Sequence, residues 1–314
     1  MAWVGLNCAL PWQTINHEKI RLSWLVGPLS VLLLGIALWR HGNQVLELAP
    51  DQEGWALLLF GLGATVAAQW LNAIAWWALL QWLRVPLPLP QVLLLFIRTN
   101  VYKYLPGGIW HQLGRLRWLR SQAVSGRRAL LAVLLDPLLM MIAALCLVPL
   151  GGLQWGLGLL APFALLLLRP CWLNPLLERL LRSKRAMLGP AEECSSDAPL
   201  LGSPWQPLLL ELPFLLLRFA GFGCCIATFS SISSLGLGVW LAAFCLAWVV
   251  GLVVPGAPGG IGVFELVLLA RLRGLIPEAE LLAVLVSYRL ISVGAELLAA
   301  AGAQIDQRLA IRSQ

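Results

Sequence analysis

Apolar residues run almost unbroken through several stretches of the chain, and each stretch approaches the thickness of a bilayer. A transmembrane helix needs about 20 apolar residues, within a range of roughly 17–25. Seven stretches fit this length or come close to it: residues 22–39, 55–83, 129–148, 153–168, 207–229, 239–254 and 280–303. The shortest, 153–168 and 239–254, require neighbouring helices or a locally thinned bilayer. The pattern predicts an all-α, polytopic membrane bundle of about seven to eight spans.

Two further apolar stretches are interrupted by proline and glycine. Residues 89–104 contain Arg98 and Lys103 and lead into Leu-Pro-Gly-Gly, whereas residues 261–272 contain Glu265 and follow Pro-Gly-Ala-Pro-Gly-Gly. Backbone groups that these residues free at membrane depth must be bonded by protein or by cavity water. Both stretches are therefore predicted to be re-entrant or broken helices facing one cavity. Their shared Pro-Gly-Gly-Ile sequence, 152 residues apart, indicates an inverted repeat of the kind found in secondary transporters.

Charged side chains are scarce, and their distribution predicts an orientation. The chain is 60% hydrophobic and 12% charged, whereas soluble domains carry about 25% charged residues. This composition excludes a soluble domain, a disordered chain and a nucleic-acid-binding protein. The net charge is +7, and most basic residues fall in loops on one side, which should be cytoplasmic.

A domain organisation follows from this orientation. We expect a multi-pass protein of the cell membrane with a cytoplasmic N-terminal segment (1–21) and a single transmembrane domain (22–305). A cytoplasmic loop near 170–205 should contain a short helix over 176–188, and a short tail (306–314) should end the chain. The sequence does not decide on which side of the membrane this tail lies.

Cysteine and histidine show no spacing typical of metal ligands. The seven cysteines include no Cys-x-x-Cys pair, four of them lie in apolar runs, and none of the three histidines pairs with a cysteine at a ligand spacing. Cysteines in such runs act as small hydrophobic residues. We therefore expect neither a metal site nor a cofactor.

Several charged residues fall at bilayer depth, where each costs roughly 2.5–3.5 kcal/mol on insertion scales. Arg98, Lys103 and Arg115 flank the first Pro-Gly-Gly and could form a cationic ring around a phosphate. Snorkelling of these side chains to lipid headgroups is the alternative. Glu265, close to the start of its helix, could pair with Arg289 or carry a proton.

Other charges share helix faces. Glu211 and Arg218 are seven residues apart, as are Arg289 and Glu296, so each pair lies on one face that should point into the bundle and pair with other helices. Asp136, which precedes a proline, is predicted to cap or kink its helix.

Three motifs resemble those of a known family. They are the run from Tyr102 to Arg115 around Pro106-Gly107-Gly108, the run over residues 255–265, and Tyr288-Arg289. Over about residues 20–305 the chain resembles the lysylphosphatidylglycerol synthase transmembrane region family, also called flippase-like integral membrane proteins. In the synthases that give the family its name, this region is linked to moving an aminoacylated phospholipid between leaflets. A separate soluble domain attaches the amino acid there, and we expect no such domain here.

The motifs and the charges beside them define a candidate substrate site. Its members are Arg98, Lys103, Pro106, Gly107, Gly108, Arg115, Pro258, Gly259, Gly260, Glu265, Tyr288 and Arg289. The leading hypothesis is a lipid flippase or transporter that binds an anionic phospholipid or lipid-linked intermediate in a central polar cavity.

Two other functions remain open. The chain could be a scaffold that binds an envelope-lipid or glycoconjugate enzyme through close helix contacts. It could also be an intramembrane lipid-modifying enzyme, for which His111 is the one histidine near the predicted cavity. No ATP-binding Gly-x-x-x-x-Gly-Lys motif and no His-Glu-x-x-His occur in the sequence, so we expect a protein that is not an enzyme.

Overall fold

Helices account for all the regular elements in the part of the chain that the structure describes. This computed structural model describes residues 48–105, 108–152, 160–183, 202–229, 235–254 and 258–312. The predicted N-terminal segment, the predicted span 22–39, and Pro106 and Gly107 lie outside these ranges. Four helices are long and apolar enough to cross a membrane: α2 (Gln52–Trp82), α5 (Gly126–Leu147, extended by a 3-10 turn to Gly151), α8 (Trp205–Phe229) and α11 (Glu278–Arg312).

Two of these long helices, α2 and α5, start at polar caps and continue through apolar sequence. The Asp51 carboxylate accepts a hydrogen bond from the Gly54 N–H at 2.7 Å at the start of α2, and the Ser125 hydroxyl caps α5. At 1.5 Å per residue, the 31 residues of α2 extend about 46 Å, beyond the roughly 30 Å of a hydrocarbon core. The long apolar runs therefore predicted these four helices correctly.

The first interrupted stretch forms a helical hairpin. It consists of α3 (Leu89–Asn100), the 3-10 helix η2 (Val101–Tyr104) and α4 (Trp110–Ser121). Twelve residues extend only about 18 Å, so neither arm is long enough to span a bilayer. The Arg128 guanidinium at the start of α5 donates to the Arg84 carbonyl just after α2, at 3.3 Å. The hairpin therefore enters and leaves the bundle at the same end.

The second interrupted stretch forms a hairpin at the opposite end. It consists of α9 (Leu237–Val253), the 3-10 turn η9 (Pro258–Gly260) and α10 (Val263–Leu272). The beginning of α9 packs where α5 finishes, since a Cβ on Gly238 would lie 2.4 Å from the Leu150 carbonyl oxygen. Each hairpin is therefore flanked by two long helices, α2 and α5 in one half and α8 and α11 in the other.

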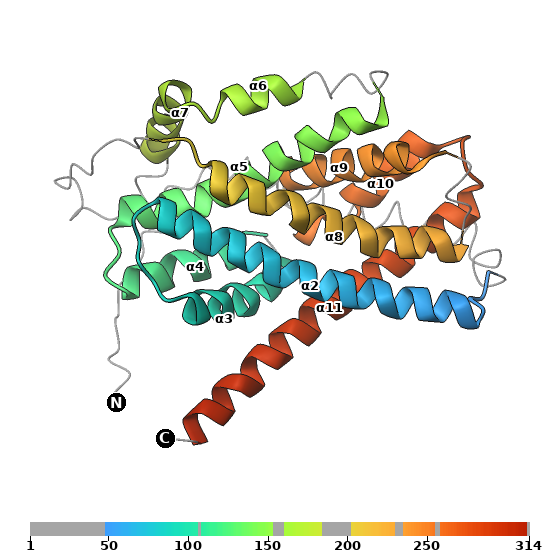
Figure 1. Ribbon diagram of the computed structural model, residues 1–314, viewed down its shortest axis with the longest axis horizontal. Helices are drawn as coiled ribbons and strands as arrows, with labels where there is room; N and C mark the ends of the chain where they lie inside the picture. The colour runs from blue at the N-terminus through green and yellow to red at the C-terminus, as the bar shows by residue number, and fades with distance from the viewer. Residues whose placement is uncertain are drawn as a thin grey trace.

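The two halves run in opposite directions. The Thr228 hydroxyl at the end of α8 donates to the Gly54 carbonyl at the start of α2, at 3.4 Å, so α2 and α8 are antiparallel neighbours. Figure 1 shows α2 and α8 lying side by side, with α11 crossing the bundle toward the end that holds α3 and α4. Contact between Arg98 of α3 and the Ala303 carbonyl of α11 agrees with this path.

Of the two short predicted spans, the structure describes 239–254 in full and 153–168 only in part. Within 153–168 the described residues form only the seven-residue helix α6 (Leu160–Leu166), which α7 (Pro170–Ser183) follows. Residues 153–159 lie outside the description. The stretch 239–254 is α9, whose 17 residues extend about 26 Å. The short helix expected over 176–188 begins earlier, as α7, and buries Leu173 and Leu177 while Trp172 is exposed.

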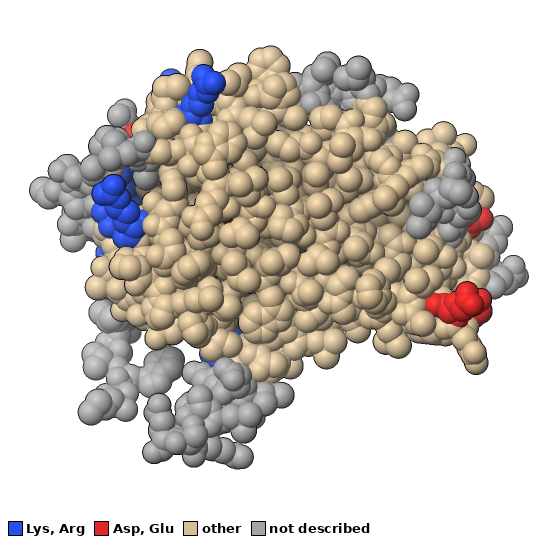
Figure 2. Space-filling view, in the orientation of Figure 1, with Lys and Arg blue, Asp and Glu red and all other residues tan. Residues whose placement is uncertain are grey.

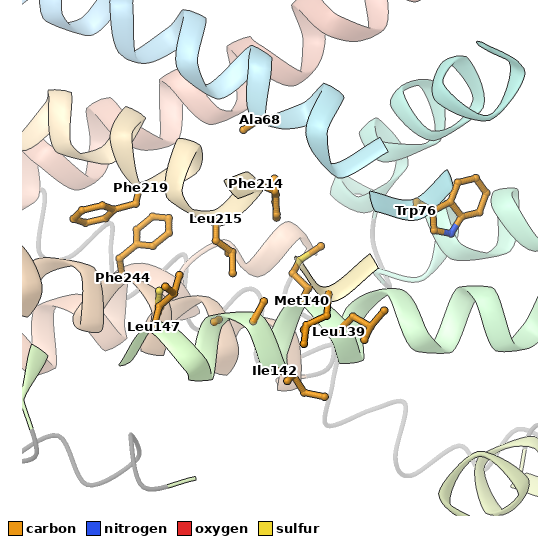
Figure 3. Packing of buried hydrophobic residues seen from close by; sticks show 14 of the residues in the cluster. Ala68, Trp76, Leu139, Met140, Ile142, Leu147, Phe214, Leu215, Phe219 and Phe244 are labelled. Atoms are coloured by element: carbon orange, nitrogen blue, oxygen red, sulfur yellow. The ribbon is translucent and has the colours of Figure 1, made fainter. Parts of the chain in front are cut away.

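The centre of the bundle is a packed apolar core. Figure 3 shows Phe214 of α8 near Met140 of α5, and Phe219 of α8 beside Phe244 of α9, near Leu147 of α5. A cluster of four aromatic rings, from α8, α9, α10 and α11, holds the second hairpin against the long helices. Its members, with centroids 5.2–6.4 Å apart, are Phe222, Phe244, Phe264 and Tyr288.

Charged side chains on the face in Figure 2 gather at the two ends of the bundle. Lys and Arg lie at the end where α2 finishes and α5 starts, and acidic residues lie at the opposite end, near the start of α2. Exposed Arg84 belongs to the first end and exposed Asp51 and Glu53 to the second. The surface between the ends is uncharged in this view, as expected of helices that face lipid.

Candidate functional site

The tips of the two hairpins touch each other deep in the bundle. A Cβ built on Gly259 of η9 would lie 2.9 Å from Cε1 of Tyr104 and 3.6 Å from Cγ of Lys103, both in η2. Gly259 also has φ +60°, in the left-handed region that side chains rarely adopt. Two reasons therefore require glycine at this position: the left-handed backbone of the turn and the close approach of Tyr104. The two broken segments therefore meet in direct contact among the described residues, and the cavity expected between them stays a prediction.

A central cluster of polar side chains surrounds Glu296 beside this contact. The Glu296 Oε1 atom accepts from Lys103 Nζ at 2.6 Å, from Gln69 Nε2 at 3.1 Å and from Arg218 Nη2 at 3.3 Å. Asn100 donates in turn to Gln69 Oε1 at 3.0 Å. Gln69, Arg218 and Glu296 are buried and come from near the middle of α2, α8 and α11. We call these five residues the central cluster.

Glu265 and Arg289 form a second ionic group at the start of α10. One Glu265 oxygen accepts from the Gly262 backbone N–H at 2.6 Å, and the other accepts from Arg289 Nε at 2.7 Å and from Arg289 Nη2. Arg289 Nη1 also lies 3.4 Å from the Gly259 carbonyl oxygen. The predicted Glu265–Arg289 pair is confirmed. It holds the start of α10 to α11, because the carboxylate bonds both the helix N-terminus and the arginine.

A third group lies between α4 and α5. Arg115 Nη1 donates to Asp136 Oδ2 at 2.8 Å, Arg115 Nε donates to Thr99 Oγ1 at 3.3 Å, and the guanidinium lies 3.6 Å from the ring centroid of Phe96. Arg115 is 1% exposed. Snorkelling of Arg115 is therefore wrong, and so is a capping role for Asp136, which lies inside α5 and pairs with this arginine.

The predicted ring of three cations is not formed in the structure. Lys103 bonds Glu296, Arg115 bonds Asp136, and Arg98 donates through Nη2 to the Ala303 carbonyl at 2.7 Å. Each cation has a partner of its own because an unpaired charge inside a membrane bundle is costly. The two expected faces do point inward, and Arg218 pairs with Glu296 of another helix, as predicted.

The remaining residues of the predicted substrate site pack against other side chains or form turns. Tyr288 belongs to the aromatic cluster and is 4% exposed. Gly108 has φ +66°, and its N–H donates to the Leu105 carbonyl at 3.2 Å. Gly260 packs against Gly251 of α9, and Pro258 starts η9. Pro106 and Gly107 lie outside the described residues.

The sequence analysis missed the two uncharged members of the central cluster. Gln69 and Asn100 lie in otherwise apolar helices, and an amide there was the signal that could have identified them. Arg218 and Glu296 were placed on inward faces but not in the candidate substrate site. The central cluster joins four helical segments that are distant in sequence, so no local motif contains it.

The central cluster and the Glu265–Arg289 pair together favour an anion. They hold three cations, Lys103, Arg218 and Arg289, against two carboxylates, Glu265 and Glu296. Nε and Nη1 of Arg218 are buried and have no hydrogen-bond partner among the described residues. Unused buried donors are costly, and an anionic group would satisfy them. The described residues contain no group of three or more His, Cys, Asp or Glu placed to hold a metal ion.

Comparison with known proteins agrees with this architecture. The family model of the lysylphosphatidylglycerol synthase TM region matches residues 20–300, which include both hairpins and all three ionic groups. The comparison with curated proteins found no match. The match covers most of the chain, and four described helices are long and apolar enough to span a bilayer. The chain is therefore a multi-pass membrane protein that belongs to the lysylphosphatidylglycerol synthase transmembrane region family.

Proposed function

We propose that this protein binds the anionic headgroup of a phospholipid or lipid-linked intermediate where its two hairpin tips meet, and moves that headgroup across the membrane. The observation that carries the proposal is the surplus of one cation at that point, with two unused donor atoms on buried Arg218. Arginine offers a planar fork that binds a phosphate through two hydrogen bonds. The site lies near the middle of the long helices, where a charged ligand would need such partners.

The surface beside these cations favours a lipid, and not a small soluble anion, as the ligand. The side chains of Lys103 and Arg289 are 18% and 22% exposed, so both are reached from the molecular surface. Tyr102, Leu105 and Ile109, which flank the first hairpin tip, are 47–53% exposed. An amphipathic ligand would place its charge on the cations and its acyl or prenyl chains on this apolar surface.

The opposite directions of the two halves supply a mechanism for movement. The order long helix, hairpin, long helix occurs twice with reversed orientation, which is the arrangement of an inverted repeat. Transporters of that design rock one repeat against the other around a central site. By the positive-inside rule, the end that carries Arg84 faces the cytoplasm of a cell-membrane protein. In this proposal Gly259 and Tyr104 form the moving contact.

A lipid-retention and scrambling experiment tests the proposal. Purified protein is extracted gently and its bound lipids are identified by native mass spectrometry, for the wild type, for Arg218→Gln and for Arg218→Lys. Arg117→Gln, which removes an exposed cation of α4, is the matched control. Loss of charged hydrogen bonds worth about 1.5–3 kcal/mol should lower retention of anionic lipid roughly 10–100-fold in Arg218→Gln.

The conservative variant separates charge from geometry. Arg218→Lys keeps the charge but loses the fork, so its retention should lie between those of the wild type and Arg218→Gln. The same variants, reconstituted in liposomes with labelled phosphatidylglycerol, should rank identically in transbilayer movement. Equal retention and equal movement in Arg218→Gln, Arg117→Gln and the wild type, with all three proteins folded, would contradict the proposal.

A further inference from the structure

One buried ionic group has more carboxyl groups than cations. Arg115 of α4, Asp136 of α5 and Glu211 of α8 are 1%, 4% and 2% exposed, respectively. Glu211 lies within electrostatic reach of both Asp136 and Arg115. The group is distinct from the central cluster, in which cations outnumber carboxylates. It holds two acids and a single guanidinium inside an apolar bundle.

The single guanidinium already forms a salt bridge with one of the two acids. Arg115 Nη1 donates to Asp136 Oδ2 at 2.8 Å, and Arg115 Nε donates to Thr99 Oγ1. The Oδ1 atom of Asp136 and the Oε2 atom of Glu211 are buried without a hydrogen-bond partner among the described residues. Asp136 therefore carries the negative charge that balances Arg115, and Glu211 has no counter-charge of its own among the described residues.

Two ionised carboxylates cannot share one arginine in this environment without a net negative charge. Like charges at short range disfavour each other, and burial disfavours the ionised form of each acid. A proton on one of the two acids makes the group neutral. We propose that Glu211 is a proton-binding site, and that a proton exchanged there couples lipid movement to the transmembrane proton gradient. The coupling rests on the proposed function; the bound proton does not.

The groups that face Glu211 support this assignment. Glu211 interacts electrostatically with the cation Arg115 of α4 and with the carboxyl group of Asp136 of α5. Arg218 lies two turns further along α8 and is bonded to Glu296 instead. The nearby rings of Trp76 and Phe96 pack on the guanidinium and bring no titratable group. Among the described residues, Glu211 is therefore the acid of this group that has no salt-bridge partner.

Two physical paths connect this site to the central cluster. The first is α8 itself, because Glu211 and Arg218 lie on the same face seven residues apart. The second runs through Thr99, which accepts from Arg115 and precedes Asn100, the donor to Gln69. A change of charge at Glu211 therefore acts on helices that hold the anion-binding cations.

Infrared spectroscopy of the purified full-length protein tests the bound proton directly. At neutral pH the wild type should show the carbonyl-stretching band of a protonated carboxylic acid, and Glu211→Gln should lose that band. Glu211→Gln leaves the Arg115–Asp136 pair intact, so the variant is expected to fold. Glu178→Gln is the matched control, because Glu178 is paired with an arginine, Arg127, and its side chain is 45% exposed. A spectrum without the band in the wild type, or with the band retained in Glu211→Gln, would overturn the proposal.

Movement of labelled phosphatidylglycerol in liposomes tests the coupling. With one proton per lipid, the ratio of rates under opposite pH gradients should reach up to about tenfold per pH unit in the wild type and in Glu178→Gln. In Glu211→Gln the two rates should be equal. Dependence on a sodium gradient in place of the pH gradient would overturn the proton assignment. If the wild type moves no lipid under any gradient, the proposed function and the coupling fail together, while the infrared band still decides whether Glu211 holds a proton.

Discussion

Replacing Gly259 by alanine should separate the two hairpin tips, and its effect can be worked out from the geometry. The new methyl group would lie 2.9 Å from Cε1 and 3.1 Å from Cδ1 of Tyr104. The backbone at Gly259 would also hold an alanine at φ +60°. Both problems are absent when the residue is glycine. The substitution therefore adds a conformational penalty and a steric one at the contact that joins the two halves.

The two penalties can be estimated and measured separately. A left-handed alanine costs about 1–2 kcal/mol, and overpacking costs about 1–3 kcal/mol. Gly259→Ala should therefore destabilise the protein by roughly 2–5 kcal/mol. Gly274→Ala is the matched control, because Gly274 has φ +77° but no atom within 4 Å of an added Cβ. The control should show the conformational penalty alone.

Reversible unfolding in mixed micelles measures both variants. The difference between Gly259→Ala and Gly274→Ala, about 1–3 kcal/mol, should vanish when Tyr104 is also replaced by alanine, since the clash is with that ring. If Gly259→Ala and Gly274→Ala have the same effect while Tyr104 is present, the tips are not in contact. The site geometry built on that contact would then be wrong.

Two further substitutions test the buried packing, also by unfolding in micelles. Asp136→Ala removes the hydrogen-bonded salt-bridge partner of buried Arg115 and should destabilise the protein by about 3–5 kcal/mol, whereas Glu178→Ala removes a half-exposed pair and should change stability by less than about 1 kcal/mol; similar effects would contradict the buried pairing. Gly221→Ala places a Cβ 2.3 Å from a threonine hydroxyl of α2 and should destabilise the protein by about 1–3 kcal/mol. Gly223→Ala is its control, because the added Cβ meets no atom within 4 Å, and this variant should be neutral or stabilising. The reverse order would show that α2 and α8 do not pack as closely as described.

The long helices were predictable from sequence because hydrocarbon allows few alternatives. In hydrocarbon no water bonds the backbone N–H and C=O groups, so they must bond one another. An apolar run of about 20 residues therefore forms a helix. The hairpins were predictable for the same reason, since Pro-Gly-Gly removes a donor and resists helix formation. The stretch 153–168 stays a prediction, because only residues 160–168 of it are described.

The pairing of charges was only partly predictable. The Glu265–Arg289 pair was predicted, and spacing showed that Arg218 points into the bundle, but it did not identify Glu296 as the partner of Arg218. Arg98, Lys103 and Arg115 are close in sequence and suggested one ring. In the folded hairpin they bond three different segments, because partner choice depends on which helices pack beside each arm. That information is held in tertiary contacts and not in local spacing.

The central cluster also determines the order in which the protein can be completed during synthesis. Lys103 and its partner Glu296 are 193 residues apart, and Gln69 and Glu296 are 227 apart. At about 5–20 residues per second, Lys103 emerges from the ribosome roughly 10–40 s before its carboxylate does. During that interval the first half must shelter an ammonium group from lipid with help from the insertion machinery or from water. Insertion of α11 ends this interval, because Glu296 of α11 then bonds the Lys103 ammonium group.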